Sequence, residues 1–377
     1  MGYSLIICWR ERARFLPAVL AVAFSALLIV LQCGLLLGAL AAASRPIDRA
    51  RADIWVASRH ASSLGFGHLI PAAWRGRLLS QPEIERAEPF LFGFGIWHKP
   101  GGGTEQCYIL GARLEEDALG GPRDLTPEMR RRLSEPGATA VYVGDLPLLG
   151  LSGQSGEAGE VAGRRVPVVG FMRGVKGAGM MPGLFCSLRT ARLLLAAPGT
   201  DADRVMYLLA RCRNSEDRSA LAARLRAEYP DMDALTGEEF SQRSRLYWLA
   251  KTKAGLALAF AAALGLFVGA IITAQTLYAA TVASLREYAV LRALGIPRWR
   301  LRLLVVTQSF WVALAGMAAA VPATVGLARL GAAFDIALSL PAWLVVTAAA
   351  VTLIMALLSG LVALRALRLT EPAVLLR

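Results

Sequence analysis

The sequence lacks the motifs that mark most ATP-binding proteins and hydrolases. No GxxxxGK(S/T) phosphate-binding loop occurs, and the nearest run, GFMRGVKGAG, has the wrong spacing. Neither a GxSxG nucleophile elbow nor an HExxH zinc motif is present. We therefore expect a non-catalytic chain that has no cofactor of its own.

Cysteine and histidine are scarce as well, with five and three residues among 377. Cys107, Cys186 and Cys212 lie in the middle of the chain, so at most one disulfide bond can form among them, and its presence stays open. Neither these cysteines nor the histidines have the spacing of metal ligands. We expect no metal site.

Charged residues are absent from four long stretches of the chain. About 20 apolar residues suffice to cross a hydrocarbon core roughly 30 Å thick, whereas a helix in a soluble core is shorter and apolar on one face only. The sequence therefore predicts four transmembrane helices. The uncharged stretches are Phe15–Ser44, Ala254–Leu285, Leu303–Ala328 and Ile336–Leu364.

A folded domain is predicted between the first and second of these stretches. Residues 45–253 carry 29 basic and 24 acidic residues together with Gly, Pro and short alternating apolar runs, which is typical of a mixed α/β domain. A helix is expected to begin at Ser215. The expected strands are Phe90–Trp97, Cys107–Gly111, Ala138–Val143, Arg165–Phe171 and Val205–Ala210.

Positive charge is concentrated outside this domain, although the net charge of the chain is +13. The loop 286–302 holds five arginines and one glutamate, and both ends of the chain are also net positive. Short basic loops stay in the cytoplasm, so this loop and both termini are expected to face inward and the domain outward. The charge therefore does not indicate nucleic-acid binding. A cleaved signal peptide is the alternative for the first stretch, but a signal peptide has only about 7–15 apolar residues.

These observations predict a membrane α-helical fold with four transmembrane helices and a large extracytoplasmic mixed α/β domain between the first and second. The predicted segments are a cytoplasmic N-terminus (1–14), the first span (15–44), a periplasmic α/β domain (45–240), a stalk helix with the second span (241–285), a cytoplasmic coupling loop (286–302), the third span (303–328), a short periplasmic loop (329–335), the fourth span (336–364) and a cytoplasmic C-terminus (365–377).

The second uncharged stretch is longer than a bilayer requires. As one helix its 32 residues would measure about 48 Å, so part of it is expected to project from the membrane. The preceding run, GEEFSQRSRLYWLAKTK, is helix-prone from Glu238. We expect a rigid stalk that continues as one helix into the second span.

Two spans contain glycines four residues apart, a spacing that lets helices approach closely. Gly34 and Gly38 lie in the first span, and Gly265 and Gly269 in the second. Gly and Ala are abundant in these spans, so chance is an alternative explanation. The four glycines are candidates for a dimer face.

The inward loop, SLREYAVLRALGIPRWRLRLL, has the most specific pattern. Its first part is an apolar helix-prone run, Gly295 suits the residue just after a helix, and Pro297 suits the first turn of the next one. An apolar helix on the cytoplasmic side needs a bilayer interface or the groove of a partner to bury it.

This loop, read as LREYAVLRALG, resembles the coupling segment of FtsX/MacB-type ABC transporter permeases. The arrangement of one span, a large outer domain, three spans and the tail RALRLTEPAVLLR is similar to the whole permease. FGFGIWHKP and GEEFSQRSRLYWLAKTKAGLALAF resemble the DevC branch, whose permeases have no fused ATPase. By this resemblance, the residues that face the ATPase are Glu287, Tyr288, Leu291, Arg292, Ala293, Leu294 and Gly295.

The resemblance implies a homodimer in the bacterial inner membrane that binds two copies of an ABC ATPase subunit, which uses the ATP. It also implies a periplasmic membrane-fusion adaptor and a TolC-like outer-membrane channel, through which substrate is exported from the periplasmic side. The spans contain no Asp, Glu, Lys, Arg or His, which disfavours an ion-coupled carrier. An FtsX-like scaffold that activates a periplasmic cell-wall hydrolase is the alternative function.

Overall fold

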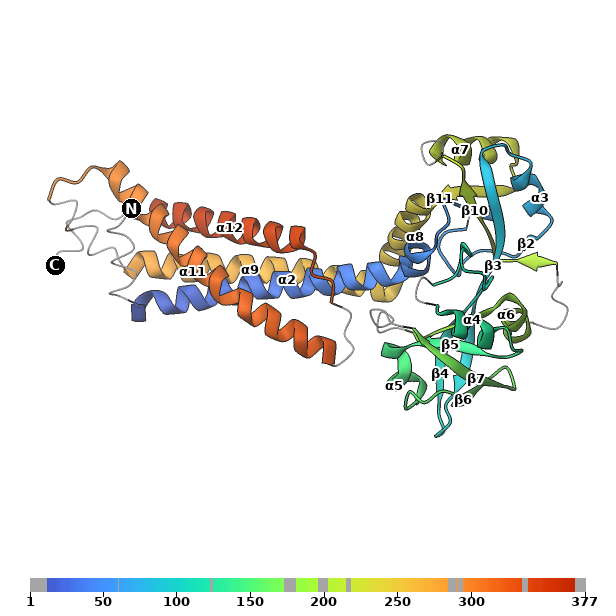
Figure 1. Cartoon of the computed structure of the whole chain (residues 1–377). Coiled ribbons are helices and arrows are strands. Elements are labelled where there is room, and N and C mark those ends of the chain that lie inside the picture. The colour runs from blue at the N-terminus through green and yellow to red at the C-terminus, as the bar shows by residue number, and fades with distance from the viewer. Residues whose placement is uncertain are drawn as a thin grey trace. The chain divides into compact units, whose positions relative to one another are not determined.

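The computed structural model describes residues 12–59, 61–122, 125–172, 181–195, 203–214, 218–283, 290, 294–333 and 338–369. The chain divides into two compact units (Figure 1). The helical unit comprises Met1–Gly38 and Leu256–Arg377, and the α/β domain comprises Ala39–Gly255.

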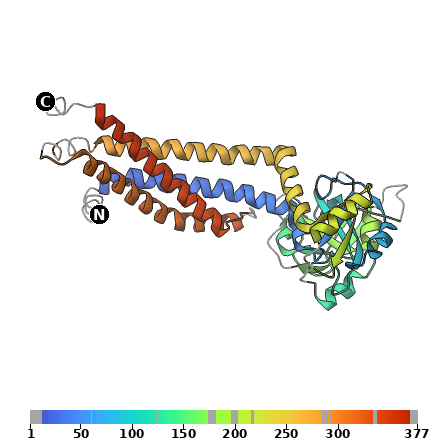
Figure 2. The same ribbon diagram turned by 90° about the horizontal axis from the view of Figure 1, so that it is seen from above.

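Four long helices make up most of the described part of the helical unit. All four are long and apolar enough to cross a membrane, with mean hydropathies of 1.8 to 2.5. They run side by side in both views of the chain (Figures 1 and 2). Together with the mixed α/β domain between the first and second helices, they confirm the predicted fold class. The helices are α2 (Arg12–Arg49), α9 (Lys253–Ala283), α11 (Arg298–Ala333) and α12 (Ala342–Leu369).

Hydroxyl side chains join the helices of this unit. The buried Ser25 of α2 donates to the carbonyl oxygen of Gly269 on α9 at 3.0 Å, and the Thr273 hydroxyl donates to Ser25 at 3.1 Å. Ser359 of α12 donates to the carbonyl oxygen of Ala274 on α9 at 3.0 Å. Hydrogen bonds of this kind associate helices in lipid, where burial of apolar surface cannot do so.

The α/β domain is a sheet with helices packed on it. Its helical segments are α3 (Trp74–Leu79), α4 (Pro127–Leu133), η1 (Val143–Asp145), α5 (Leu146–Leu149), α6 (Leu188–Leu195), α7 (Arg218–Glu228) and α8 (Gly237–Lys251). Its strands are β1 (Ile54–Ser58), β2 (Ile70–Pro71), β3 (Ile84–His98), β4 (Thr104–Ala112), β5 (Thr139–Tyr142), β6 (Ala158–Val161), β7 (Arg164–Met172), β8 (Gly183–Ser187), β9 (Arg204–Val205), β10 (Tyr207–Cys212) and β11 (Met232–Thr236).

Within the described residues, nine of these strands form one sheet in the order β11-β1-β10-β3-β4-β8-β5-β7-β6, and β2 pairs with β9. The β3–β4 hairpin is antiparallel, whereas β4 pairs with β8 and β5 with β7 in parallel. The five expected strands correspond to β3, β4, β5, β7 and the pair β9 and β10, and the helix expected near Ser215 corresponds to α7.

Both faces of the sheet are covered, which explains why the sequence pattern did not predict β1 as a strand. Neighbouring side chains of a strand point to opposite faces. In β1, Ile54 and Val56 enter one buried cluster while Trp55 and Ala57 enter another. A strand buried on both sides is apolar throughout, without the alternation that marks a half-exposed strand.

Four aromatic side chains form the centre of one cluster and fix α8 to the sheet. Phe240 of α8 is fully buried, and its ring centroid lies 5.5 Å from those of both Trp55 and Tyr207. Phe90 completes the group, 5.4 Å from Trp55. At the start of α8, Thr236 and Glu239 form a reciprocal capping box, which satisfies two backbone N–H groups that the first turn leaves unpaired. The expected stalk helix is therefore part of the α/β domain.

The expectation of one continuous helix from the stalk into the second span is wrong at Thr252. This residue has an extended backbone, with φ −96° and ψ 141°, between α8 and α9. Its hydroxyl donates to the carbonyl oxygen of Trp248 at 2.6 Å and accepts from the N–H of Gly255 at 2.9 Å. The same side chain therefore closes one helix and opens the next, a role that threonine performs well. The break is a defined turn of the chain.

Candidate functional site

The inward loop is described at Val290 and from Leu294 onward. The N–H of Leu294 donates to the carbonyl oxygen of Val290 at 3.0 Å, as in a helical turn. Gly295 follows with φ +87°, the left-handed conformation that ends many helices and that glycine adopts most easily. Pro297 then directly precedes α11, where its missing N–H costs no hydrogen bond. The predicted sequence of helix end, glycine and new helix is confirmed at these residues.

Apolar side chains are exposed around this turn. Leu294 is 75% exposed, Val290 48% and Trp299 60%. The guanidinium of Arg300 lies 5.3 Å from the Trp299 ring centroid, a cation–π distance. The turn therefore presents apolar surface beside positive charge. Leu294 and Gly295 are the predicted ATPase-facing residues that the structure places, while Glu287, Tyr288, Leu291, Arg292 and Ala293 lie outside the described residues.

Three of the glycines predicted for a dimer face lie against neighbouring helices or loops of the same chain. A Cβ on Gly269 would lie 3.3 Å from Ser25, and one on Gly265 would lie 3.0 Å from Gln32, both residues of α2. The carbonyl oxygen of Gly34 accepts a hydrogen bond from the N–H of Ser339 at 3.1 Å. Close approach, the physical basis of the prediction, is thus present within one chain. A contact between two copies through these residues and Gly38 stays a prediction.

An ion-pair cluster that the sequence did not indicate ties the end of α2 to α8. Arg245 of α8 donates to the Ser44 hydroxyl and to the Asp48 carboxylate, each at 2.8 Å. Ser44 also donates to Asp48 at 2.7 Å. A forked guanidinium fixes two acceptors at once, so the last turns of α2 are oriented on α8. The partners lie about two hundred positions apart in sequence, and no local pattern reveals them.

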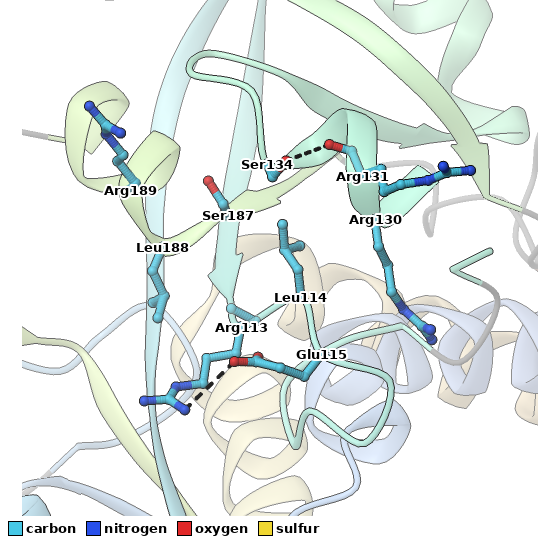
Figure 3. Close-up of a pocket in the computed structure, with 10 residues that line it drawn as sticks. Arg113, Leu114, Glu115, Arg130, Arg131, Ser134, Ser187, Leu188 and Arg189 are labelled. Atoms are coloured by element: carbon cyan, nitrogen blue, oxygen red, sulfur yellow. Dashed lines mark hydrogen bonds and ion pairs between the residues drawn. The ribbon is translucent and has the colours of Figure 1, made fainter. Parts of the chain in front are cut away.

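An open pocket of about 530 Å³ lies at α4, α6 and the end of β4. Four arginines line it, but Figure 3 shows the guanidinium groups of Arg131 and Arg189 pointing away from each other. Arg113 lies 3.7 Å from the Glu115 carboxylate (Figure 3). The positive charge is therefore dispersed over the surface and does not converge on one anion.

The cysteine side chains of the α/β domain are buried. Burial raises the pKa of the Cys107 thiol to about 12, and burial also raises the pKa of the Cys186 thiol. Cys107, Cys186 and Cys212 are free thiols. Within the described parts of the chain, no group of three His, Cys, Asp or Glu side chains is placed to hold a metal ion.

Solved structures resemble this chain weakly. The periplasmic region of MacB from Actinobacillus actinomycetemcomitans is 12% identical, with a TM-score of 0.34, over 52% of this chain and 94% of that one. The extracellular domain of the noncanonic ABC-type transporter YknZ from Gram-positive bacteria is 10% identical, with a TM-score of 0.32, over 49% and 98%. A domain of a putative permease from Porphyromonas gingivalis is 12% identical, with a TM-score of 0.31, over 50% and 88%.

The sequence match to a protein family is confined to the helical part of the chain. No curated protein matches the chain. Residues 259–372 match the family described as FtsX-like permease C-terminal. The match includes most of α9, the inward loop, α11 and α12. From residue 259 to residue 372, this chain is therefore similar to FtsX-like permease C-terminal domains.

Proposed function

We propose that this chain is the membrane subunit of an ABC exporter of the FtsX/MacB type and that it acts as a homodimer with two copies of a separate ATPase subunit. The observation that carries the proposal is the FtsX-like match over residues 259–372, in a chain whose α/β domain is inserted between its first two spans. The missing phosphate loop agrees with ATP hydrolysis by a partner, since this chain has no such motif to bind the nucleotide.

The inward turn is the proposed contact with the ATPase. Leu294 and Val290 supply exposed apolar surface that the groove of a partner would bury. Glu287 and Arg292 are proposed to make its polar contacts, and Tyr288, Leu291, Ala293 and Gly295 to complete it. Motion of the turn would reach α9 directly, because α9 ends just before the loop.

On the outer side, the proposed output is export by a DevC-type route. The α/β domain would handle the substrate in the periplasm and meet a membrane-fusion adaptor, which is joined to a TolC-like channel. The segments Phe15–Ser44 and Leu303–Ala328 carry no acidic, basic or histidine side chain, which supports handling of the substrate outside the membrane helices. In this proposal the chain lies in a bacterial inner membrane with both termini in the cytoplasm.

Identification of the bound partners tests the proposal. The tagged chain would be purified from native membranes in a mild detergent, and the co-purified proteins identified by mass spectrometry. We expect an ABC ATPase together with a periplasmic adaptor protein. A cell-wall hydrolase in place of the adaptor would favour the FtsX-like scaffold over export, and a preparation without any ATPase would refute both functions.

A further inference from the structure

A groove of about 430 Å³ in the helical unit is lined by residues of α9 and α12. Its polar side chains are those of Gln275, Tyr278 and Ser359, and the rest of the lining is apolar. The buried Ser359 already donates its hydroxyl hydrogen to the carbonyl oxygen of Ala274. Gln275 is exposed, and its side-chain amide makes no hydrogen bond to any residue that the structure describes. The surface of α9 therefore presents an unpaired amide.

This amide lies at the depth of the hydrocarbon core when α9 spans a bilayer. The helix has no charged residue after Lys253, and its end at Ala283 is about 12 Å beyond Gln275 along the helix. An amide without a partner is costly in this layer, because lipid tails offer no hydrogen bond. Hydroxyl groups avoid the cost by bonding to their own helix, as Thr352 does by donating to the carbonyl oxygen of Ala348 at 2.8 Å. The amide of Gln275 needs a partner from outside the chain.

The same side of α9 carries exposed residues with the spacing of a coiled coil, here called the α9 stripe. They recur at alternating intervals of three and four residues, the 3.5-residue period with which two helices pack along a left-handed seam. Gln275 directly follows the alanine of the stripe and so flanks this seam. Lipid tails cover apolar side chains as well as a helix does, but they leave the amide unpaired. The α9 stripe consists of Leu264, Phe267, Ile271, Ala274 and Tyr278.

A second copy of the chain fits this stripe. Within one chain, α2 packs on another side of α9, since Gly269 lies against Ser25 and Ala274 is about 140° around the helix from Gly269. Copies of one membrane protein insert with the same orientation, so two α9 stripes meet in parallel and in register about a two-fold axis. The small side chain of Ala274 then allows a close approach. Each Gln275 amide faces the other helix at the same depth.

We infer that the α9 stripe is the membrane contact between two copies of this chain and that Gln275 hydrogen-bonds across it. The inference rests on the homodimer of the proposed function and assigns the face through which that dimer forms. This face is distinct from the side of α9 that carries Gly265 and Gly269. A polar group beside an apolar seam also fixes the register of the two helices, because a shifted pair leaves the amides unpaired.

Disulfide crosslinking of the full chain in its native membrane tests the contact. Two copies with different epitope tags are co-expressed with Cys8 and Cys33 replaced by serine, while the three buried cysteines of the α/β domain stay in place. A disulfide bond needs Cβ atoms about 4 Å apart. Under mild oxidation, Ala274→Cys should therefore give a crosslinked dimer that contains both tags. The matched control is Ala279→Cys, an exposed alanine of α9 outside the stripe, and it should give little crosslinked dimer.

The affinity of the dimer tests the amide. Energy transfer between donor- and acceptor-labelled chains in liposomes gives the Kd of the dimer as the lipid dilutes the protein. Gln275→Leu suits a bilayer better than glutamine does, yet it should raise this Kd about tenfold, because two hydrogen bonds between membrane helices are lost. Ala279→Leu changes the same helix outside the stripe and should leave the Kd unchanged.

The outcomes separate this inference from the proposed function. If energy transfer shows a dimer but Ala274→Cys crosslinks no better than Ala279→Cys, the contact lies elsewhere and the inference is overturned, while the proposed homodimer stands. A Kd of Gln275→Leu equal to that of the wild type, or crosslinks from Ala274→Cys to a different protein alone, would overturn it in the same way. A chain that stays monomeric in the presence of its ATPase would refute the homodimer itself.

Discussion

Replacing Gly255 by alanine is expected to open the break between α8 and α9. A Cβ at this position would lie 2.2 Å from the carbonyl oxygen of Trp248 and 2.9 Å from the Cα of Leu249, both backbone atoms. The backbone must shift to relieve the overlap, and the shift removes the hydrogen bond from the Gly255 N–H to Thr252. Overpacking costs about 1–3 kcal/mol, and loss of a threonine cap costs about 1 kcal/mol more.

Hydrogen exchange on the full chain measures this cost locally. A loss of about 2–4 kcal/mol corresponds to amide exchange faster by roughly 30- to 1,000-fold in the segment 248–258, if the segment opens independently of the sheet. Exchange in β10 should not change. The matched control is Gly76→Ala in the exposed helix α3, where a Cβ meets nothing within 4 Å. If Gly255→Ala exchanges like the wild type and like Gly76→Ala, the account of the break is refuted.

Three further predictions concern the α/β domain. Phe240→Ala should destabilise it by about 3–5 kcal/mol in urea unfolding, and a change below 1 kcal/mol would contradict the anchoring of α8. Because the pKa of Cys107 is about 12, its alkylation at pH 8 should be roughly a thousandfold slower than that of an exposed thiol, and rapid labelling of the folded chain would refute its burial. The hydrogen bond from Arg224 holds the pKa of Glu83 below its ordinary value. Any gain in the free energy of unfolding of the wild type over Glu83→Gln is therefore present above about pH 4, and it is lost as the pH falls through the lowered pKa of Glu83 in the folded chain. An advantage that persists in acid would contradict this pairing.

The helices of the membrane and the turn at Gly295 could be read from sequence because their signals are local. A charge-free stretch of membrane-spanning length has few soluble alternatives, and a glycine followed by proline two residues later marks a helix end and a new start. The strands that contain Phe90, Cys107 and Arg165 are short apolar or alternating runs, and buried and partly buried residues alternate clearly in β7, so these signals are local too.

The features that sequence did not reveal depend on tertiary contacts. Nothing in Lys251-Thr252-Lys253 distinguishes a break from a continuing helix, because threonine is tolerated in helices and only the hydroxyl geometry shows its capping role. The bond between Arg245 and Asp48 and the ring pair of Phe66 and Tyr247 join distant parts of the chain.

The inward turn is proposed to couple this chain to an ATPase, and the ATPase rate of the co-purified complex tests this coupling most directly. Leu294 is 75% exposed, so Leu294→Asp should change folding stability by no more than about 0.5 kcal/mol while it removes apolar contact with the partner. We expect Leu294→Asp, Leu291→Asp and Glu287→Lys to abolish the increase in ATPase rate that the wild-type chain causes. The control Leu79→Asp, which changes an exposed leucine of α3, should retain this increase. Wild-type stimulation by all three loop variants, with normal complex formation, would contradict the account.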